Sequence, residues 1–483
     1  MRARTCTSLL PAALALFAAL LPACSGKAAD AERPNVVVIV LDTVRPDYLS
    51  AYGFDKPTSP YLEEFAKEGT RFERAWSSSS WTLPAHASLF SGTGPVYHRA
   101  TQATEHVAQD VPLLAERLRD AGYQTLGLSA NMWVSRTTGL DRGFEEFHDE
   151  WSFRQRLRAR ASEHPFIHAL RGWFERVREP KKPFFAFFNL TAAHMPYLSH
   201  WEEAQPFFEN KEAWQAAITE LFPDNGTGLL IRQFGTGKKL DERELGNLRA
   251  LYEGTLRRVD AITAALMSVV DQHADPKNTL VFVLSDHGEN LGEHEQISHM
   301  FNLYESTMRI ALLARGPGFG AGVVEEHQAQ ITDIYPTVLR AAGLEPEPIC
   351  TGLDLRGDLP ERRTLTGWLE RPTISMGIFP QSVQQSGVLA RYDHTLGAAI
   401  GPEFKQLLAG DGGSELFDIA RDPGETAPLS ELPPEPMERL RRVLEAQRAL
   451  EARRRSADWK GNALQDPHSR KGLQDLGYTG EDK

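Results

Sequence analysis

The chain has 483 residues and carries 53 lysine and arginine against 65 aspartate and glutamate side chains, a formal net charge of -12. An acidic chain without a basic block argues against nucleic-acid binding. Its length exceeds what one core usually serves, so we expect a large domain and a smaller one. Because Cys350 is the single cysteine beyond residue 24, we expect no disulfide in the folded part and no cysteine-held metal.

The amino-terminal segment predicts export. Two arginines precede an apolar run over about residues 9–21, which is shorter than the ~20 residues that span a bilayer and typical of a secretory signal. The run ends in "LPAC", which resembles the lipobox of bacterial lipoproteins; ordinary cleavage nearby is the alternative. We expect residues 1–23 to be a lipoprotein signal peptide. The mature protein would be periplasmic or at the cell surface, with a lipid on Cys24 as its membrane contact.

Strand and helix patterns then alternate over residues 33–357, the expected catalytic domain. The strand candidates are continuous apolar runs, as in strands buried on both faces of a parallel sheet. In the first helix Ser59 is the expected cap and Gly69 the stop. The alternation predicts an α/β domain with a mostly parallel sheet, whose ligands lie at the carboxyl ends of strands. Strands are expected at 35–42, 124–131, 183–190 and from 278, and helices at 59–69, 111–123 and from 248.

The carboxyl-terminal part has a different pattern. Short strand-like runs broken by Gly, Asp and Pro over residues 358–432 predict a small antiparallel sheet. Residues 433–483 read as a charged helix, roughly 435–455, followed by a polar, loosely ordered tail. We find no internal repeat.

Polar residues follow three of the strands. Asp42 ends the first strand, "TAAHMPY" after the third delivers His194, and the last strand runs into Asp286 and His287, with His299 downstream. Carboxylates and histidines at one edge of a sheet form a candidate metal site. Each residue alone also has an ordinary structural interpretation, so it is the combination that favours a site.

At these motifs the chain resembles a known family. "RPNVVVIVLDTVRPDYLSAYGF" followed by "TSPYLEEFAKEGTRFERAWS" is similar to the opening of sulfatases of the alkaline phosphatase superfamily, and "SDHGENLGEHEQISHMFNLYESTMRIALLARGPG" resembles their second metal-binding segment. "ITDIYPTVLRAAGL", "ELFDIARDPGETAPLSEL" and "LQDLGYTG" resemble later landmarks. The resemblance implies an alkaline-phosphatase-like α/β sandwich, with helices on both sides of a mostly parallel sheet and a small carboxyl-terminal subdomain.

The chain departs from this family at the nucleophile. Most sulfatases carry Cys-x-Pro-x-Arg, or Ser for Cys, whose first residue becomes formylglycine; here the stretch is Thr82-Leu83-Pro84-Ala85-His86, so formylglycine is not expected. Asp42-Thr43 and Asp286-His287 also replace the family's paired aspartates and Asp-Asn. An imidazole ligand suits zinc or manganese better than calcium.

The set Asp42, Thr82, Asp286 and His287 resembles the metal ligands of relatives with a threonine nucleophile. These are nucleotide pyrophosphatases, phosphoethanolamine transferases and lipoteichoic acid synthases. In the transferases, histidines placed like His194 and His299 hold a second metal or handle the leaving group. Those transferases use Glu where Asp42 stands and carry transmembrane helices that this chain lacks, so a different substrate is expected.

The resulting hypothesis is a metal-dependent hydrolase of sulfate or phosphate esters, on small molecules or glycans, that works through a covalent Thr82 ester. Pro84 would lie in the first turn of a helix whose amino end favours the anion. His86 would donate a hydrogen bond to a substrate oxygen, and His194 and His299 would protonate the leaving group or bind a second metal.

Other interpretations remain open. Thr82, taken alone, also has the interpretation of a cap of the helix that begins at "LPAHASLF". The chain could be a phospho-head-group transferase of the phosphoethanolamine type, or a lipid-anchored binding protein with a degenerate site. We interpret Arg45 as an anchor of the first loop and Asp333 as structural, and leave Glu289 and His294 between support of the site and surface loop.

Overall fold

We describe a computed structural model of the chain over residues 33–149, 159–370 and 394–454, with positions 383, 387 and 389–392 between the last two ranges. The predicted signal peptide, Cys24 and the tail after residue 454 lie outside the described residues. Within the described residues no helix is both long and apolar enough to cross a membrane.

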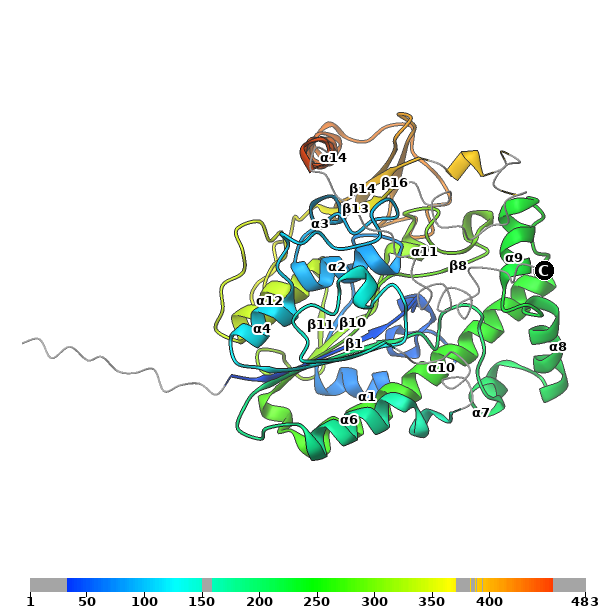
Figure 1. The fold of residues 1–483 in the computed structure, drawn as a ribbon. Helices are drawn as coiled ribbons and strands as arrows, with labels where there is room; N and C mark the ends of the chain where they lie inside the picture. Colours follow the sequence, from blue (N-terminus) through cyan, green and yellow to red (C-terminus); the bar gives the residue numbers. More distant parts are fainter. Residues whose placement is uncertain are drawn as a thin grey trace, which may run out of the picture. The chain divides into compact units, whose positions relative to one another are not determined.

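An eight-stranded sheet forms the centre of the large domain, with the order β11-β2-β10-β7-β1-β6-β4-β5 (Figure 1). The central strand β1 pairs in parallel with β6 on one side and β7 on the other. Its residues are buried on both faces, which explains the unbroken apolar run. The strands are β1 Asn35–Leu41, β2 Thr70–Phe72, β4 Gln124–Ser129, β5 Glu146–His148, β6 Phe184–Leu190, β7 Thr279–Ser285, β10 Leu312–Arg315 and β11 Val323–Glu325.

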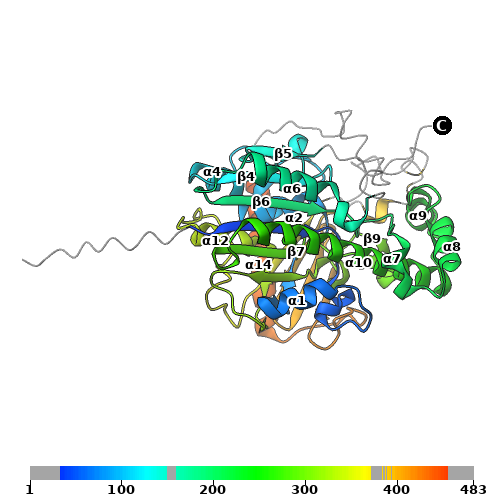
Figure 2. The same ribbon diagram turned by 90° about the horizontal axis from the view of Figure 1, so that it is seen from below.

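Helices cover both faces of this sheet (Figures 1 and 2). On one face α10 contacts α1 and α6, and on the other α2 contacts α4 and α12. This confirms the predicted α/β architecture. The bounds are α1 Pro60–Glu68, α2 Thr82–Ser91, α4 Leu114–Asp120, α6 Pro165–Arg176, α10 Glu242–His273 and α12 Ile334–Ala341. Smaller elements are β3 Ala75–Trp76, β8 Asn290–Leu291, β9 Ile297–Ser298, β12 Ala329–Gln330, α3 Pro95–His98, α7 Trp201–Ala204, α8 Lys211–Leu221, α9 Thr227–Leu230 and α11 Glu305–Met308.

The start of α1 corrects one prediction. Ser59 occupies the cap position, but its side chain makes no capping hydrogen bond; instead its hydroxyl accepts from the Ala51 N–H at 3.0 Å. Asp260 of α10 caps the helix instead, because its carboxylate accepts hydrogen bonds from the N–H groups of Tyr61 and Leu62, both at 2.9 Å. A carboxylate from another helix therefore satisfies the exposed donors at this helix end.

Gly69 ends α1 as predicted, but for a steric reason. Its φ of -141° lies in the extended region, where no glycine is needed for conformational freedom. A Cβ at this position would lie 2.2 Å from the carbonyl oxygen of Ala314. The glycine thus lets the chain after α1 lie against the edge of β10.

The carboxyl-terminal subdomain is a four-stranded antiparallel sheet with one long helix, as predicted. Strands β13 Leu365–Leu369, β14 Leu396–Ile400, β15 Phe404–Ala409 and β16 Ser414–Asp418 pair in sequence order. Helix α14, Pro434–Arg454, packs on β14 and β15. A small apolar cluster joins helix and sheet, formed by Ala399, Leu416, Leu432, Leu440 and Leu444.

A buried ion cluster joins this subdomain to the large domain. The Lys405 ammonium of β15 is fully buried and lies 3.0 Å from Glu305 of α11 and 2.8 Å from Glu425. Glu305 also accepts a hydrogen bond from the Trp76 indole. Burial raises the pKa of Glu425 to about 7; Lys405 lowers this pKa and the nearby Glu305 raises it. The cluster therefore depends on its single cation.

We predict that Lys405→Met is strongly destabilising, because it leaves two buried carboxylates without their cation. Breaking such a cluster costs about 3–5 kcal/mol of unfolding free energy. Urea denaturation followed by tryptophan fluorescence measures this, with Arg441→Met on the exposed face of α14 as a control that should leave the midpoint unchanged. An unchanged midpoint in Lys405→Met would show that the cluster does not join the two parts.

Candidate metal and nucleophile site

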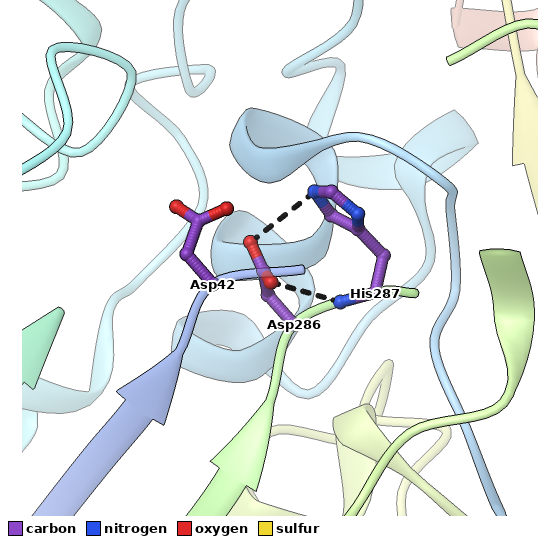
Figure 3. Close-up of side chains that lie close together, drawn as sticks. All are labelled: Asp42, Asp286 and His287. Atoms are coloured by element: carbon purple, nitrogen blue, oxygen red, sulfur yellow. Dashed lines mark hydrogen bonds and ion pairs between the residues drawn. The ribbon is translucent and has the colours of Figure 1, made fainter. Parts of the chain in front are cut away.

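The strand register brings the predicted metal ligands together. Leu41 pairs with Ser285 across β1 and β7, so the residues that follow, Asp42 and Asp286, leave the sheet side by side at its carboxyl edge. His287 comes next on the same loop. The three side chains are fully buried, and one ligand atom from each lies within 4.8 Å of the others (Figure 3). This is the one group of three such residues found among the described residues.

In each carboxylate one oxygen accepts hydrogen bonds and the other accepts none. Asp42 Oδ2 accepts from Asn131 Nδ2 at 2.7 Å, and Asp286 Oδ1 accepts from the N–H groups of Thr43 and His287 at 3.2 and 2.9 Å. Asp42 Oδ1 and Asp286 Oδ2 are buried and accept no hydrogen bond. Buried carboxylate oxygens of this kind are costly unless they bind a cation. The arrangement therefore fits two monodentate metal ligands.

His287 has the tautomer that a metal ligand needs. Its Nδ1 lies 2.9 Å from the carbonyl oxygen of Gly288, and a carbonyl can only accept, so the proton is on Nδ1. The Nε2 lone pair faces the site, 3.4 Å from Asp286 Oδ2 and 3.4 Å from Thr82 Oγ1. A backbone carbonyl that fixes one ring nitrogen is the usual support for a metal-bound imidazole.

The electrostatics of the site also favour a cation. Burial alone would raise the pKa of Asp42, but His194, His287 and the Asn131 hydrogen bond hold that pKa below its usual value. Burial and the neighbouring Asp42 carboxylate raise the pKa of Asp286 well above its usual value. Burial and His299 lower the pKa of His287, which keeps this imidazole neutral. Two carboxylates in mutual repulsion beside a neutral imidazole form a donor set for a divalent ion.

A strained residue shapes the turn after β1. Thr43 has a φ of 63°, which is unfavourable for a β-branched residue. Its N–H donates to Asp286 Oδ1, and its carbonyl accepts from the Tyr252 hydroxyl at 2.7 Å. The turn is thereby fixed between α10 and the loop after β7, directly beside Asp42.

Thr82 is the first residue of α2 and is almost fully buried, with 1% of its surface exposed. Its hydroxyl lies 3.4 Å from both His287 Nε2 and Asn131 Nδ2, so it faces the candidate metal ligands. This geometry argues against the alternative that Thr82 serves as a helix cap. Pro84 lies in the first turn of α2, as predicted. The amino end of the helix accordingly points its dipole at the site.

His86 reaches the site one turn into α2. Its Nδ1 lies 2.9 Å from the carbonyl oxygen of Thr82, and its Nε2 lies 3.3 Å from Asn189 Nδ2. Burial lowers the pKa of His86 to about 4, so the ring is neutral, with its proton on Nδ1. Both nitrogens have partners within the protein, and the hydrogen bond from His86 to a substrate oxygen stays a prediction.

His194 and His299 lie next to His287. The ring of His299 lies 4.5 Å from that of His287 and 5.1 Å from that of His194, centroid to centroid. His299 Nδ1 is 3.1 Å from Glu289 Oε1. Burial and His194 lower the pKa of His299 to about 3, and burial raises the pKa of Glu289 to about 8. The structure thus brings His194, His299 and Glu289 to the site together.

The other interpreted residues lie around the site. Arg45 anchors the first loop as expected, through ion pairs with Asp47 at 2.6 Å and Glu293 at 2.8 Å, and it also donates to the carbonyl of Glu289. Asp333 is structural, because it pairs with Arg363 at 2.6 Å. His294 stacks on Tyr304, with ring centroids 3.7 Å apart.

Sequence analysis missed two asparagines of the site. Asn131 follows β4, and Asn189 is the penultimate residue of β6. Both contact Asp42 Oδ2, at 2.7 and 3.5 Å. A signal for them was present in the sequence: both lie at the carboxyl ends of predicted parallel strands, where ligands are expected. Polar residues at the ends of the other predicted strands were considered as site residues for the same reason.

Comparison with known proteins identifies the family of this chain. Residues 34–344 match the family model described as Sulfatase. Arylsulfatase K of Homo sapiens is 23% identical over 433 residues, covering 82% of this chain and 78% of the relative. The solved phosphonate monoester hydrolase of Agrobacterium radiobacter has a TM-score of 0.67 at 20% identity, covering 87% of this chain and 96% of its own.

A further structure, of a protein in complex with its substrate D-glucosamine-2-N,6-O-disulfate, also has a TM-score of 0.67, at 17% identity over 87% of this chain and 98% of its own. These structures confirm the predicted sandwich fold. The family model covers well over half of the chain. The chain therefore belongs to the sulfatase family of the alkaline phosphatase superfamily and is an ester hydrolase of the sulfatase type.

Proposed function

We propose that this protein is an exported, metal-dependent hydrolase of sulfate or phosphate esters that acts through a covalent Thr82 intermediate. The observation that carries the proposal is the position of the Thr82 hydroxyl. It lies at the amino end of α2, 3.4 Å from His287 Nε2, beside the two carboxylates whose inner oxygens accept no hydrogen bond.

Asp42, Asp286, His287 and the Thr82 oxygen would hold the metal. The donor set of two carboxylates, one imidazole and one hydroxyl favours zinc or manganese over calcium. A divalent metal bound there would lower the pKa of the Thr82 hydroxyl and offset the negative charge of the substrate.

The protein's own residues support an in-line displacement. The Thr82 oxygen attacks sulfur or phosphorus, the bond to the alcohol oxygen of the substrate breaks, and that oxygen leaves with a proton. Water then attacks the same sulfur or phosphorus, and Thr82 is released with its proton restored. The amino end of α2 stabilises the anionic group throughout, because the helix dipole places partial positive charge beside Thr82.

His194 and His299 are the proposed proton carriers. Their rings lie 5.1 Å apart, and the ring of His299 lies 4.5 Å from that of His287, centroid to centroid. Glu289 orients His299 through its Nδ1. A residue that gives a proton to the leaving oxygen in the first step takes one from water in the second. Binding a second metal is the alternative role for this pair.

Relatives and neighbours indicate the substrate class. One is called an arylsulfatase, one structure contains a disulfated glucosamine, and another is a phosphonate monoester hydrolase. We therefore propose a sulfate- or phosphate-type ester of a small molecule or glycan. The leader and the "LPAC" motif support export and a lipid anchor at Cys24.

We predict that Thr82→Val abolishes turnover while keeping the fold, since valine has the shape of threonine without the nucleophilic oxygen. The expected loss in kcat is roughly 10³-fold or more. The assay screens p-nitrophenyl sulfate, p-nitrophenyl phosphate, bis-p-nitrophenyl phosphate and a phosphonate monoester. Thr93→Val, just beyond the end of α2 and equally buried, is the matched control.

Two further measurements make the Thr82 test decisive: the mass of the Thr82 peptide and the identity of the acceptor of the transferred group. Acid-quenched wild-type protein should show the mass of one sulfuryl or phosphoryl group on the peptide that contains Thr82, and that peptide should otherwise be unmodified. Full activity in Thr82→Val would disprove the nucleophile. Transfer of the group to an added alcohol rather than to water would instead identify a transferase, and absence of all turnover would favour a binding protein.

We also predict that the purified protein retains about one zinc or manganese ion per chain through Asp42 and Asp286. Asp286→Asn should lose most of this metal because one of the two carboxylates becomes neutral. Asp354→Asn, whose carboxylate pairs with Arg356 away from the site, should keep it. Elemental analysis after dialysis measures the content. Retention of calcium alone, or unchanged metal in Asp286→Asn, would contradict the proposed site.

A further inference from the structure

Asn131 contacts both a proposed metal ligand, Asp42, and the proposed nucleophile, Thr82. Its Nδ2 is 2.7 Å from Asp42 Oδ2 and 3.4 Å from Thr82 Oγ1. An amide nitrogen carries two hydrogens, so one N–H is available for each oxygen. Asn131 is 2% exposed, and bulk water therefore does not compete for these bonds.

The orientation of this amide is fixed by its surroundings. The N–H of Trp133 donates to Asn131 Oδ1 at 2.9 Å, an Asx turn that requires oxygen at that position. The reversed amide would place two donors against each other and an oxygen against the Asp42 carboxylate. Ser129 holds the backbone, since its hydroxyl bonds to both the N–H and the carbonyl of Asn131.

We infer that Asn131 is a catalytic residue whose amide holds Asp42 as a monodentate metal ligand and donates to the Thr82 oxygen when that oxygen carries negative charge. The inference rests on the proposed function for its second half only. Because Oδ2 of Asp42 is occupied by Asn131, the Oδ1 oxygen without a partner is the one left to face a cation.

The two steps of the reaction depend differently on this donor. While Thr82 is esterified, its oxygen bridges to sulfur or phosphorus and is a weak acceptor. When water breaks that bond, the oxygen leaves as a charged species, and a hydrogen bond to it strengthens. Asn131 therefore accelerates breakdown of the covalent ester more than its formation from an activated substrate.

Asn131→Ala tests both halves. Competition with a chelator should show zinc or manganese binding about 10–100-fold weaker than in the wild type, as for loss of a group that orients a metal ligand. With p-nitrophenyl esters at saturating metal, kcat should fall roughly 10²-fold. The quenched protein should contain more Thr82 ester than the wild type, which a purely structural defect would not produce.

Asn35 provides a matched control at the opposite end of β1. It is also buried, its Oδ1 accepts from the Phe184 N–H, and its Nδ2 donates to the Thr279 hydroxyl. Asn35→Ala should change neither metal affinity nor ester accumulation. Asn131→Asp is the second variant, because it keeps the acceptor for Trp133 and hence the turn. It removes the donor to Thr82, so the ester should accumulate in this variant too.

The outcomes separate this inference from the proposed function. Wild-type metal affinity in Asn131→Ala, or no gain of ester in either Asn131 variant of an active enzyme, would overturn it. If the wild-type protein cleaves no ester at all, the proposed function fails, and metal affinity then decides the role of Asn131 toward Asp42. Weaker binding in Asn131→Ala but not in Asn35→Ala would still support that role.

Discussion

The site depends on the parallel pairing of β1 with β7. That register pairs Leu41 with Ser285, so the next residues, Asp42 and Asp286, lie side by side where both strands end. Both side chains are fully buried. Two carboxylates so placed repel each other, and hydrogen-bond donors from the surrounding structure contact their outer oxygens. Asn131, the Thr43 N–H and the His287 N–H supply them. The inner oxygens are left for a cation, and Thr82 is presented beside them by α2.

Replacement of the usual cysteine by threonine is accompanied by changes around it. His86 stands where the family motif has arginine, and the structure uses it to bind the Thr82 carbonyl and face Asn189. The neutral imidazole adds no positive charge near the nucleophile. In the proposed mechanism, the positive charge needed by an anionic substrate would then come from the metal and the helix end, as a hydroxyl nucleophile that requires activation would need.

The parts of the fold read correctly from the sequence were those governed by local patterns. Unbroken apolar runs predicted the positions of β1, β6 and β7. Asp42, Asp286 and His287 were predicted to lie together because they come directly after β1 and β7. The cap of α1 was misassigned to Ser59, since the actual partner, Asp260, lies on α10 far along the chain. Asn131 and Asn189 were missed because an asparagine at the end of a strand is common as a turn former, and only the folded structure shows that both contact Asp42. The predicted roles of His86, His194 and His299 rest on resemblance and stay predictions.

The left-handed backbone conformation at Thr43 lowers the stability of the fold but holds Asp42 rigidly in place. Glycine would adopt this conformation without the steric cost that a β-branched residue meets there. Glycine would also loosen the peptide between Asp42 and the Tyr252 hydroxyl that grips the Thr43 carbonyl. Threonine keeps Asp42, a proposed metal ligand, on a stiff support, and glycine at this position would exchange that rigidity for a less strained backbone.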